Sequence, residues 1–215
     1  MIDPDDSDDL NRWVGIMNKA HGYGGVFNHE TPADKVTVEL STCREWCESI
    51  ATEFGLSVGE PEHNPNDPPD CFVTVDGQRL DVELIQLVEA EHKQRATNDE
   101  TPHAGQLFLD MQWSKERLIS RLNDVLKKKG DKYERKGKRI DVLLIHTAET
   151  WLNSTQAGEW LADVVMERHP NIASVFLLFE YEPGQGMQRW PVFWLYGDLS
   201  GARLPPNSDN SPFDI

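Results

Sequence analysis

The chain contains few cysteines, few basic residues and no long apolar run. Its three cysteines among 215 residues form an odd and sparse set, which excludes a disulfide scaffold and predicts reduced thiols. No apolar stretch approaches the length that spans a bilayer, and the start of the chain lacks the basic and apolar regions of a secretory signal. With 38% hydrophobic and 27% charged residues, the composition instead predicts a globular protein of the cytoplasm.

Basic residues are scarce overall, since 21 Lys and Arg stand against 37 Asp and Glu, for a net charge of −16. Such a chain repels phosphate as a whole, but its charges are unevenly distributed. Residues 114–139 contain eleven Lys or Arg and only four acids. One basic face on an acidic body could hold a polyanion, although a solvated helix end explains the same run of charge. The residues expected to contact nucleic acid, DNA in the first instance, are Lys115, Arg121, Lys128, Lys132, Arg135 and Lys136.

The length suits one packed domain with an extension at each end. Residues 1–35 begin with an acidic stretch and include one short predicted helix. Residues 36–200 carry the periodic apolar segments of a folded domain, and residues 201–215 form a tail with three prolines. We therefore expect one α/β domain between an acidic N-terminal extension and a proline-rich C-terminal tail.

The first half of the domain predicts a strand followed by a helix. Residues 36–40 alternate between apolar and polar, as in a short strand. Thr42 and Glu45 form a capping box that opens a predicted helix as far as Phe54, and Gly55 closes it.

The remaining segments predict one long loop, another helix and three strands. Residues 89–106 have too little apolar content to pack, which predicts a mobile loop whose histidines, His92 and His103, could approach a substrate. His146 follows a buried strand, where it could bind a ligand or cap the next segment. The buried strand covers 140–145, the helix covers 157–168, and the closing strands cover 175–181 and 190–196.

One acid precedes a predicted β-hairpin and another lies on its second strand. Residues 71–75 are β-prone, Asp76-Gly77 is a strong turn signal, and residues 78–88 continue as an increasingly apolar strand. This pattern places Asp70 at the mouth of the hairpin and Glu83 on the returning strand. A carboxylate on an otherwise buried strand needs a partner, and a divalent cation is a suitable one.

The segment 113–133 predicts an amphipathic helix with one buried stripe. Continuing the stripe leads to Lys129 and then Tyr133, whereas Lys127 and Lys128 point toward solvent. An inward lysine either lies at the rim of the core or reaches into the acidic site. The stripe consists of Leu118, Ile119, Leu122, Val125 and Leu126.

The order of these features resembles the PD-(D/E)XK nuclease superfamily, which has the restriction endonuclease-like fold. The likeness covers about residues 42–197. It rests on Pro69-Asp70 before the hairpin, on Glu83 in the strand from Leu80 to Val88, and on the helical lysines 127–129 that lead to the strand at 140–146. The patterns PPD, VEL-x-x-L, QW-x-x-x-R-L and LLIHTAE narrow the likeness to one branch that lacks the usual motif lysine.

The resemblance implies an α/β domain in which helices flank a mixed sheet. It also implies Mg²⁺ or Mn²⁺ held by Asp70, Glu83 and the backbone carbonyl of Leu84, with phosphodiester hydrolysis as the reaction. In many members an acid on the preceding helix completes the metal site. The acids of the predicted helix are Glu45, Glu48 and Glu53, of which Glu48 is the first candidate.

The chain departs from the superfamily pattern at Ile85, which stands where the motif has its lysine. Three residues could replace that lysine. Gln86 could turn to the site through a bulge, Glu83 could take the lysine's place with Asp81 as the strand acid, or Lys129 could reach over from the helix.

We therefore expect a metal-dependent nuclease in which Lys129 orients the water or stabilises the transition state. A homodimer would present two sites to the two strands of a duplex. The alternative is a protein that keeps the fold without catalysis and binds nucleic acid or another protein, which Ile85 and the acidic surface favour. A hydrolase of small phosphate esters using the same two carboxylates is a third interpretation.

Overall fold

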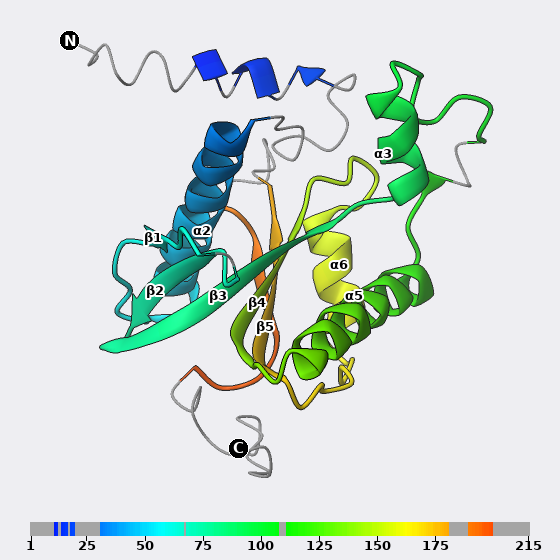
Figure 1. Cartoon of the computed structure of the whole chain (residues 1–215). Helices are drawn as coiled ribbons and strands as arrows, with labels where there is room; N and C mark the ends of the chain where they lie inside the picture. The colour runs from blue at the N-terminus through cyan, green and yellow to red at the C-terminus, as the bar shows by residue number, and fades with distance from the viewer. Residues whose placement is uncertain are drawn as a thin grey trace.

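A six-stranded mixed β-sheet forms the centre of the structure, a computed structural model that describes residues 11–12, 14–16, 18–19, 31–66, 68–107, 111–180 and 189–199. The strands lie side by side in chain order (Figure 1). They are β1 (Glu62–His63), β2 (Cys71–Val75), β3 (Gln78–Leu87), β4 (Ile140–Thr147), β5 (Ile172–Phe179) and β6 (Val192–Tyr196). The helices are α2 (Pro32–Phe54), α3 (Ala90–Thr97), α5 (Lys115–Arg135) and α6 (Ser154–Leu161). The predicted α/β class with a mixed sheet is confirmed.

Both antiparallel and parallel pairs occur in the sheet. Strands β1, β2 and β3 pair antiparallel, β3, β4 and β5 pair parallel, and β6 returns antiparallel to β5. Asp76 and Gly77 form the β2–β3 turn with φ values of 47° and 80°, the pair of positive angles that a two-residue hairpin turn requires. The hairpin predicted from Asp76-Gly77 is therefore confirmed.

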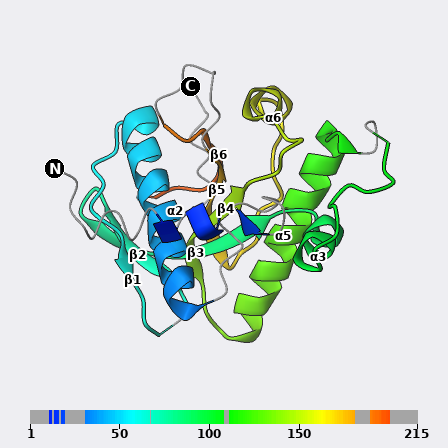
Figure 2. The same ribbon diagram turned by 90° about the horizontal axis from the view of Figure 1, so that it is seen from above.

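Helices cover both faces of the sheet. Helix α2 lies on one face, and α5 and α6 lie on the other (Figure 2). Trp46 and Ile50 of α2 pack against Val73 and Phe176, whereas Leu122 of α5 belongs to the core on the opposite face. Because β4 and β5 are covered on both faces, their sequences are nearly continuous apolar runs.

Helix α2 begins eleven residues before the predicted position, because its N-cap is Thr31 and not Thr42. The Thr31 side chain accepts a hydrogen bond from the Asp34 backbone N–H at 3.1 Å, and the Asp34 carboxylate accepts one from the Thr31 N–H at 3.3 Å. This capping box, followed by a proline in the first turn, starts the helix at Pro32. The strand predicted for 36–40 is therefore wrong, and Thr42 lies inside the helix. Gly55 closes α2 with φ 67°, as predicted.

Two further predictions require correction. The loop predicted for 89–106 contains α3, because burying His92 and Ala96, four residues apart, is enough to hold a short helix on the domain. The helix predicted for 157–168 starts and ends earlier as α6. The Asn153 side chain accepts a hydrogen bond from the Gln156 backbone N–H at 3.0 Å and so caps the helix before the predicted start.

The ends of the chain lie mostly outside the described residues. In the predicted N-terminal extension, residues 11–12 and 14–16 are helical, and Arg12 forms an ion pair with Asp34 at 3.5 Å. The predicted tail, 201–215, is wholly outside the described part. Within that part, every helix is too short or too polar to cross a membrane.

Candidate functional site

Asp70 and Glu83 lie close together where the β2–β3 hairpin opens. The backbone N–H of Asp70 donates to the Val82 carbonyl at 3.1 Å, and Asp70 Oδ2 accepts a hydrogen bond from the Leu84 backbone N–H at 2.7 Å. Glu83 stands between these two residues of β3. Asp70 is 7% exposed and Glu83 is 2% exposed. The hairpin thus brings the two predicted acids together in a buried position.

Helix α5 supplies a cation and a hydroxyl to Glu83. Lys129 Nζ lies 2.6 Å from Glu83 Oε1 and 3.5 Å from the Leu84 carbonyl oxygen. The Tyr133 hydroxyl, one helical turn later, donates a hydrogen bond to Glu83 Oε2. Lys129 therefore points toward the sheet and reaches the acidic site, as the stripe on the helix indicated, while Lys127 and Lys128 are exposed.

The geometry of β3 favours Lys129 among the three replacements for the motif lysine. Ile85 packs against the core on the α5 side of the sheet. Gln86 Oε1 accepts a hydrogen bond from Lys93 of α3 at 2.6 Å, and the β3–β4 register runs without a shift through this position. Asp81 uses its backbone N–H to bind Asp141 Oδ2 at 3.0 Å. Lys129 contacts Glu83 directly, so it occupies the position from which a helical lysine could act.

Helix α2 contributes Glu39 and Lys35 rather than Glu48. Glu39 is 9% exposed and its charge acts on Asp70, while Lys35 Nζ lies 3.2 Å from Glu39 Oε1 and 4.0 Å from Asp70 Oδ1. Glu48 is half-exposed and forms an ion pair with Arg189. Nine residues of helix, about 13 Å, separate Glu39 from Glu48. Recognising the capping box at Thr31 would have placed Glu39 on the buried face of α2.

Burial and neighbouring charge raise the pKa of Asp70 to about 7. Desolvation of the carboxylate is the largest cause, the negative charge of Glu83 is the second, and Glu39 adds to it. The hydrogen bond from Leu84 and the positive charge of Lys129 oppose the shift. An acid that keeps its proton near neutral pH lies in surroundings short of positive charge, and a divalent cation would supply that charge.

Replacing Asp70 with asparagine is expected to stabilise the metal-free protein in weakly alkaline solution. The pKa of Asp70 is about 7 in the fold and 3.8 ordinarily, so the folded state binds more protons between these values. The free energy of unfolding therefore falls as the pH rises through this window. Asparagine stays neutral and can still accept the Leu84 hydrogen bond. We expect a gain of about 1–2 kcal/mol near pH 8 and none near pH 4, measured by urea unfolding in chelator.

The matched control for this change is Asp124→Asn, since Asp124 is an exposed acid on α5. Its removal should leave the dependence of stability on pH as it is in the parent protein. If Asp70→Asn lost stability at both ends of the pH range, the carboxylate would be a stabilising group and the reasoning from its surroundings would be wrong.

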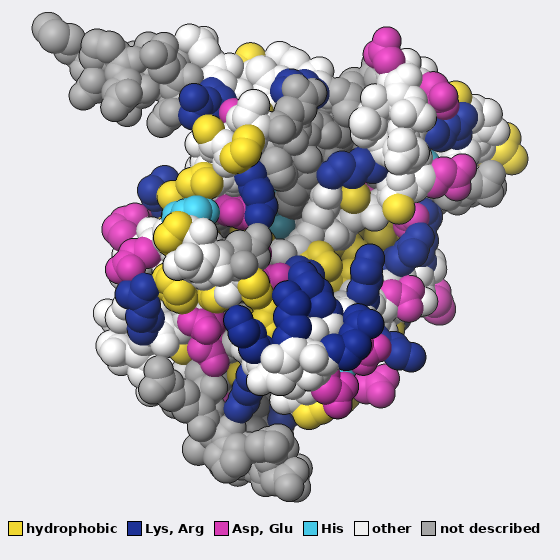
Figure 3. All heavy atoms as spheres, viewed as in Figure 1, with side chains coloured by type: hydrophobic (Ala, Val, Ile, Leu, Met, Phe, Trp, Pro, Cys, Tyr) yellow, Lys and Arg dark blue, Asp and Glu magenta, His cyan; other side chains and the backbone are white. Residues whose placement is uncertain are grey.

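The predicted basic residues lie along α5 and the turn that follows it. Figure 3 shows Lys and Arg side chains gathered over α5, with acids among them. Arg121 is engaged by Glu89, with Nη2 2.6 Å from Oε2, and Arg117 binds the same carboxylate at 3.1 Å. Lys115 is half-buried. The exposed members of the predicted set, besides Arg121, are Lys128, Lys132, Arg135 and Lys136.

Of the three histidines singled out in the sequence, His92 and His146 are buried and His103 is partly buried. His146 is inside β4 and fully buried, burial lowers its pKa to about 3, and its ring centroid lies 5.1 Å from that of Trp190. Its ring is therefore enclosed within the sheet instead of exposed at the end of the strand. His92 is buried on α3, and its ring centroid lies 4.4 Å from that of His103. His103 Nε2 accepts a hydrogen bond from Trp151 Nε1 at 3.2 Å.

A second group of side chains could hold a metal ion. Among the described residues, only Asp131, Glu134 and His169 bring three suitable ligand atoms within 4.8 Å of one another. Sequence reasoning missed this group, because His169 lies far along the chain from the two acids of α5 and just beyond a segment predicted as helix. The acids around Asp70 do not form such a group.

Comparisons with protein-family models, curated proteins and solved structures found no match to the chain.

Proposed function

We propose that the chain is a divalent-metal-dependent nuclease of the PD-(D/E)XK type with a restriction endonuclease-like fold. The observation that carries the proposal is the meeting of Asp70, Glu83 and Lys129 in one buried site, from a hairpin and a helix far apart in the sequence. A buried carboxylate such as Asp70, whose pKa is raised by desolvation and by a neighbouring carboxylate, is typical of functional sites. The order of helix, hairpin, helix and parallel strand supports the same fold type.

The residues of the site fit Mg²⁺ or Mn²⁺. Asp70, Glu83 and the carbonyl of Leu84 offer the oxygen ligands these ions prefer. The raised pKa of Asp70 indicates that the acids lack sufficient positive charge, although Lys35 and Lys129 lie beside them. A bound ion would lower the pKa of water and neutralise charge that develops on the phosphate.

The chain's own side chains would position the reacting groups. Lys129 touches both Glu83 and the Leu84 carbonyl, so its ammonium group is placed to orient a water or to stabilise a negative oxygen. Tyr133 fixes the second carboxylate oxygen of Glu83. Glu39 is the acid of α2 whose charge acts on Asp70, so it takes the role first given to Glu48, although its oxygens are not gathered with those of Asp70 and Glu83.

The exposed lysines and arginines of α5 are the proposed contact with the nucleic-acid backbone, DNA in the first instance. The helix that carries Lys129 toward the acids also carries Lys128 and Lys132 toward solvent. A backbone seated on these side chains would lie along the same element as the site. A homodimer would bring two sites to a duplex, which is the arrangement proposed for cleavage of both strands.

One observation favours a second function, binding without cleavage. Both oxygens of Glu83 already accept hydrogen bonds, one from Lys129 and one from Tyr133. A closed network of this kind also occurs as a structural ion pair. In that case the chain would be a catalytically degenerate member of the fold type that binds nucleic acid or protein.

The proposal is tested with the double variant Asp70→Ala, Glu83→Ala. We expect the parent protein to cleave a mixed-sequence DNA or RNA in Mn²⁺ and not in chelator, and the variant to lose about a hundredfold or more of this activity. Thermal unfolding should show a midpoint raised by Mn²⁺ in the parent alone. The control is Glu91→Ala, which removes an exposed acid of α3 and should change neither result.

The outcomes separate the two functions. Cleavage that survives in the double variant would contradict the nuclease site proposed here. Stabilisation by Mn²⁺ without cleavage of any substrate would favour the binding function. A shift in midpoint that persists in the double variant would place the bound ion elsewhere in the protein.

A further inference from the structure

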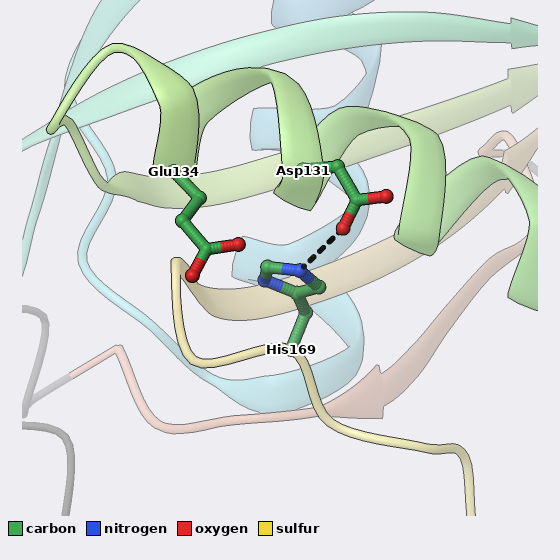
Figure 4. Close-up of side chains that lie close together, drawn as sticks. All are labelled: Asp131, Glu134 and His169. Atoms are coloured by element: carbon green, nitrogen blue, oxygen red, sulfur yellow. Dashed lines mark hydrogen bonds and ion pairs between the residues drawn. The ribbon is translucent and has the colours of Figure 1, made fainter.

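Two acids of α5 and one histidine meet on the surface next to the last turn of the helix. Asp131 and Glu134 are three residues apart, so they lie on one side of α5, and His169 comes from the segment that leads into β5. Figure 4 shows both carboxylates directed toward the His169 ring. Asp131 Oδ1 lies 3.4 Å from His169 Nε2. His169 is largely buried, with 15% of its side chain exposed, and Asp131 is half-exposed.

The helix has a cradle for the histidine ring. A Cβ atom at Gly130 would lie 2.3 Å from Cγ and Cδ2 of His169, so a side chain at this position would displace the ring. Glycine in the interior of a helix is unfavourable on its own. Here it lets the imidazole lie against the backbone beside Asp131. The backbone N–H groups of His169 and Asn171 hold the segment by donating to the Tyr196 hydroxyl at 3.4 Å and to His169 Nδ1 at 3.2 Å.

The two gathered carboxylates point to a cation, although Lys132 and Arg135 lie in the same last turn of the helix. The C-terminal end of a helix carries the negative end of its dipole, where carboxylates are disfavoured and positive charge is favoured. Asp131 and Glu134 nevertheless stand in the last turns of α5 with their oxygens gathered. A divalent ion between them and His169 would offset both the repulsion of the two carboxylates and the helix dipole.

We propose that Asp131, Glu134 and His169 form a site that takes Zn²⁺ in preference to Mn²⁺, as sites for the late divalent transition metals do. One imidazole nitrogen and two carboxylate oxygens are a ligand set that such ions accept, with water completing the coordination, whereas Mg²⁺ prefers oxygen alone. The Asn171 N–H donates to Nδ1, so the neutral ring carries its proton on Nε2 and donates it to Asp131. Zinc held at Nε2 would require this proton to move to Nδ1, so the ring would give up the hydrogen bond that it accepts from Asn171.

Zinc at this site would join α5 to the segment before β5. Asp131 and Glu134 alternate along the helix with Lys129 and Tyr133, which face Glu83. The bound ion would hold the end of the helix in the position from which Lys129 and Tyr133 reach Glu83. The role of the ion in positioning Lys129 and Tyr133 rests on the proposed function, whereas the binding of the ion itself does not.

The test is calorimetric titration of Zn²⁺ into the full chain after treatment with chelator. We expect the parent to bind one equivalent that His169→Gln loses, with affinity falling at least about tenfold in Asp131→Asn. Gly130→Ala keeps all three ligands but displaces the ring, so it should also lose the equivalent. The control is His63→Gln on β1, and the Asp70→Ala, Glu83→Ala variant should bind Zn²⁺ as the parent does.

Circular dichroism of each variant identifies any loss of binding that comes from unfolding. A parent that binds no Zn²⁺, or a folded His169→Gln protein that binds it as tightly as the parent, would overturn the proposal. Mg²⁺ that binds as tightly as Zn²⁺ would also overturn it. The Asp70→Ala, Glu83→Ala variant separates the two sites. Failure of the Zn²⁺ proposal would leave the nuclease proposal standing, and failure of the nuclease proposal would leave the Zn²⁺ proposal standing.

Discussion

Replacing Lys129 with methionine is expected to lower the free energy of unfolding by about 3 kcal/mol in chelator. The ammonium group lies 2.6 Å from Glu83 Oε1, and Glu83 is only 2% exposed. Methionine has a similar length but no charge, so it leaves the buried Glu83 carboxylate beside the Tyr133 hydroxyl without the ammonium group that balances its charge. Breaking a buried pair on one side is costly, because the partner's charge stays behind without compensation. Urea unfolding near neutral pH measures the loss.

Two further variants distinguish the effect of the Lys129–Glu83 ion pair from the effect of changing either side chain alone. Lys128→Met removes the neighbouring lysine, which is exposed, and should change stability by less than about 0.5 kcal/mol. The double variant Glu83→Gln, Lys129→Met removes both charges while the amide can still accept from Tyr133. It should be more stable than the sum of the single effects predicts, by about 1–3 kcal/mol. An effect of Lys129→Met as small as that of Lys128→Met would show that the contact contributes little.

The Lys129→Met variant also tests whether Lys129 has a catalytic or only a structural role. If Mn²⁺ binds beside Glu83, its charge compensates the carboxylate, and part of the stability lost in Lys129→Met returns when the ion is added. Cleavage would stay low even so, because the ion does not replace a group that orients water or stabilises the transition state. Recovery of stability without recovery of activity is thus the result expected of a nuclease.

The position of the two acids could be predicted because it depends on short-range patterns. Asp76-Gly77 sets the turn, and the two-residue period of β3 then fixes where Glu83 lies relative to Asp70. Lys129 could be placed on the sheet side of α5 because a strong apolar stripe, with Leu118, Leu122 and Leu126 fully or nearly fully buried, fixes the rotation of that helix. Local geometry and one amphipathic helix were therefore enough to predict that Asp70, Glu83 and Lys129 lie together.

The remaining residues of the site depend on information that a local pattern does not carry. Val36, Val38 and Leu40 alternate as in a strand, yet the capping box at Thr31 prevails and turns Glu39 toward Asp70. The meeting of His169 with Asp131 depends on how β5 pairs with β4, a contact between distant segments. Such contacts follow from the assembled sheet and cannot be read from spacing along the chain.

Replacing Gly197 with alanine is expected to lower the free energy of unfolding by about 3 kcal/mol or more. Gly197 follows β6 with φ 104°, a backbone conformation that residues with a side chain rarely adopt. Its Cβ would also lie 2.2 Å from the Ala173 carbonyl oxygen and 2.5 Å from Ser174 Cα. Both atoms belong to the backbone of β5, which pairs with β4 and β6, so neither can yield without disturbing the sheet.

Gly137 provides the matched control, because it has φ 61° but open space around its Cβ position. Alanine there should cost only about 1–2 kcal/mol, the penalty of the left-handed conformation alone. The difference between the two variants therefore measures the close approach of the chain to β5. Equal losses would show that β5 moves to admit the methyl group. The Mn²⁺ binding proposed for Asp70 and Glu83 should be unchanged in the folded fraction of Gly197→Ala, because β4 and β5 separate the β2–β3 hairpin from β6.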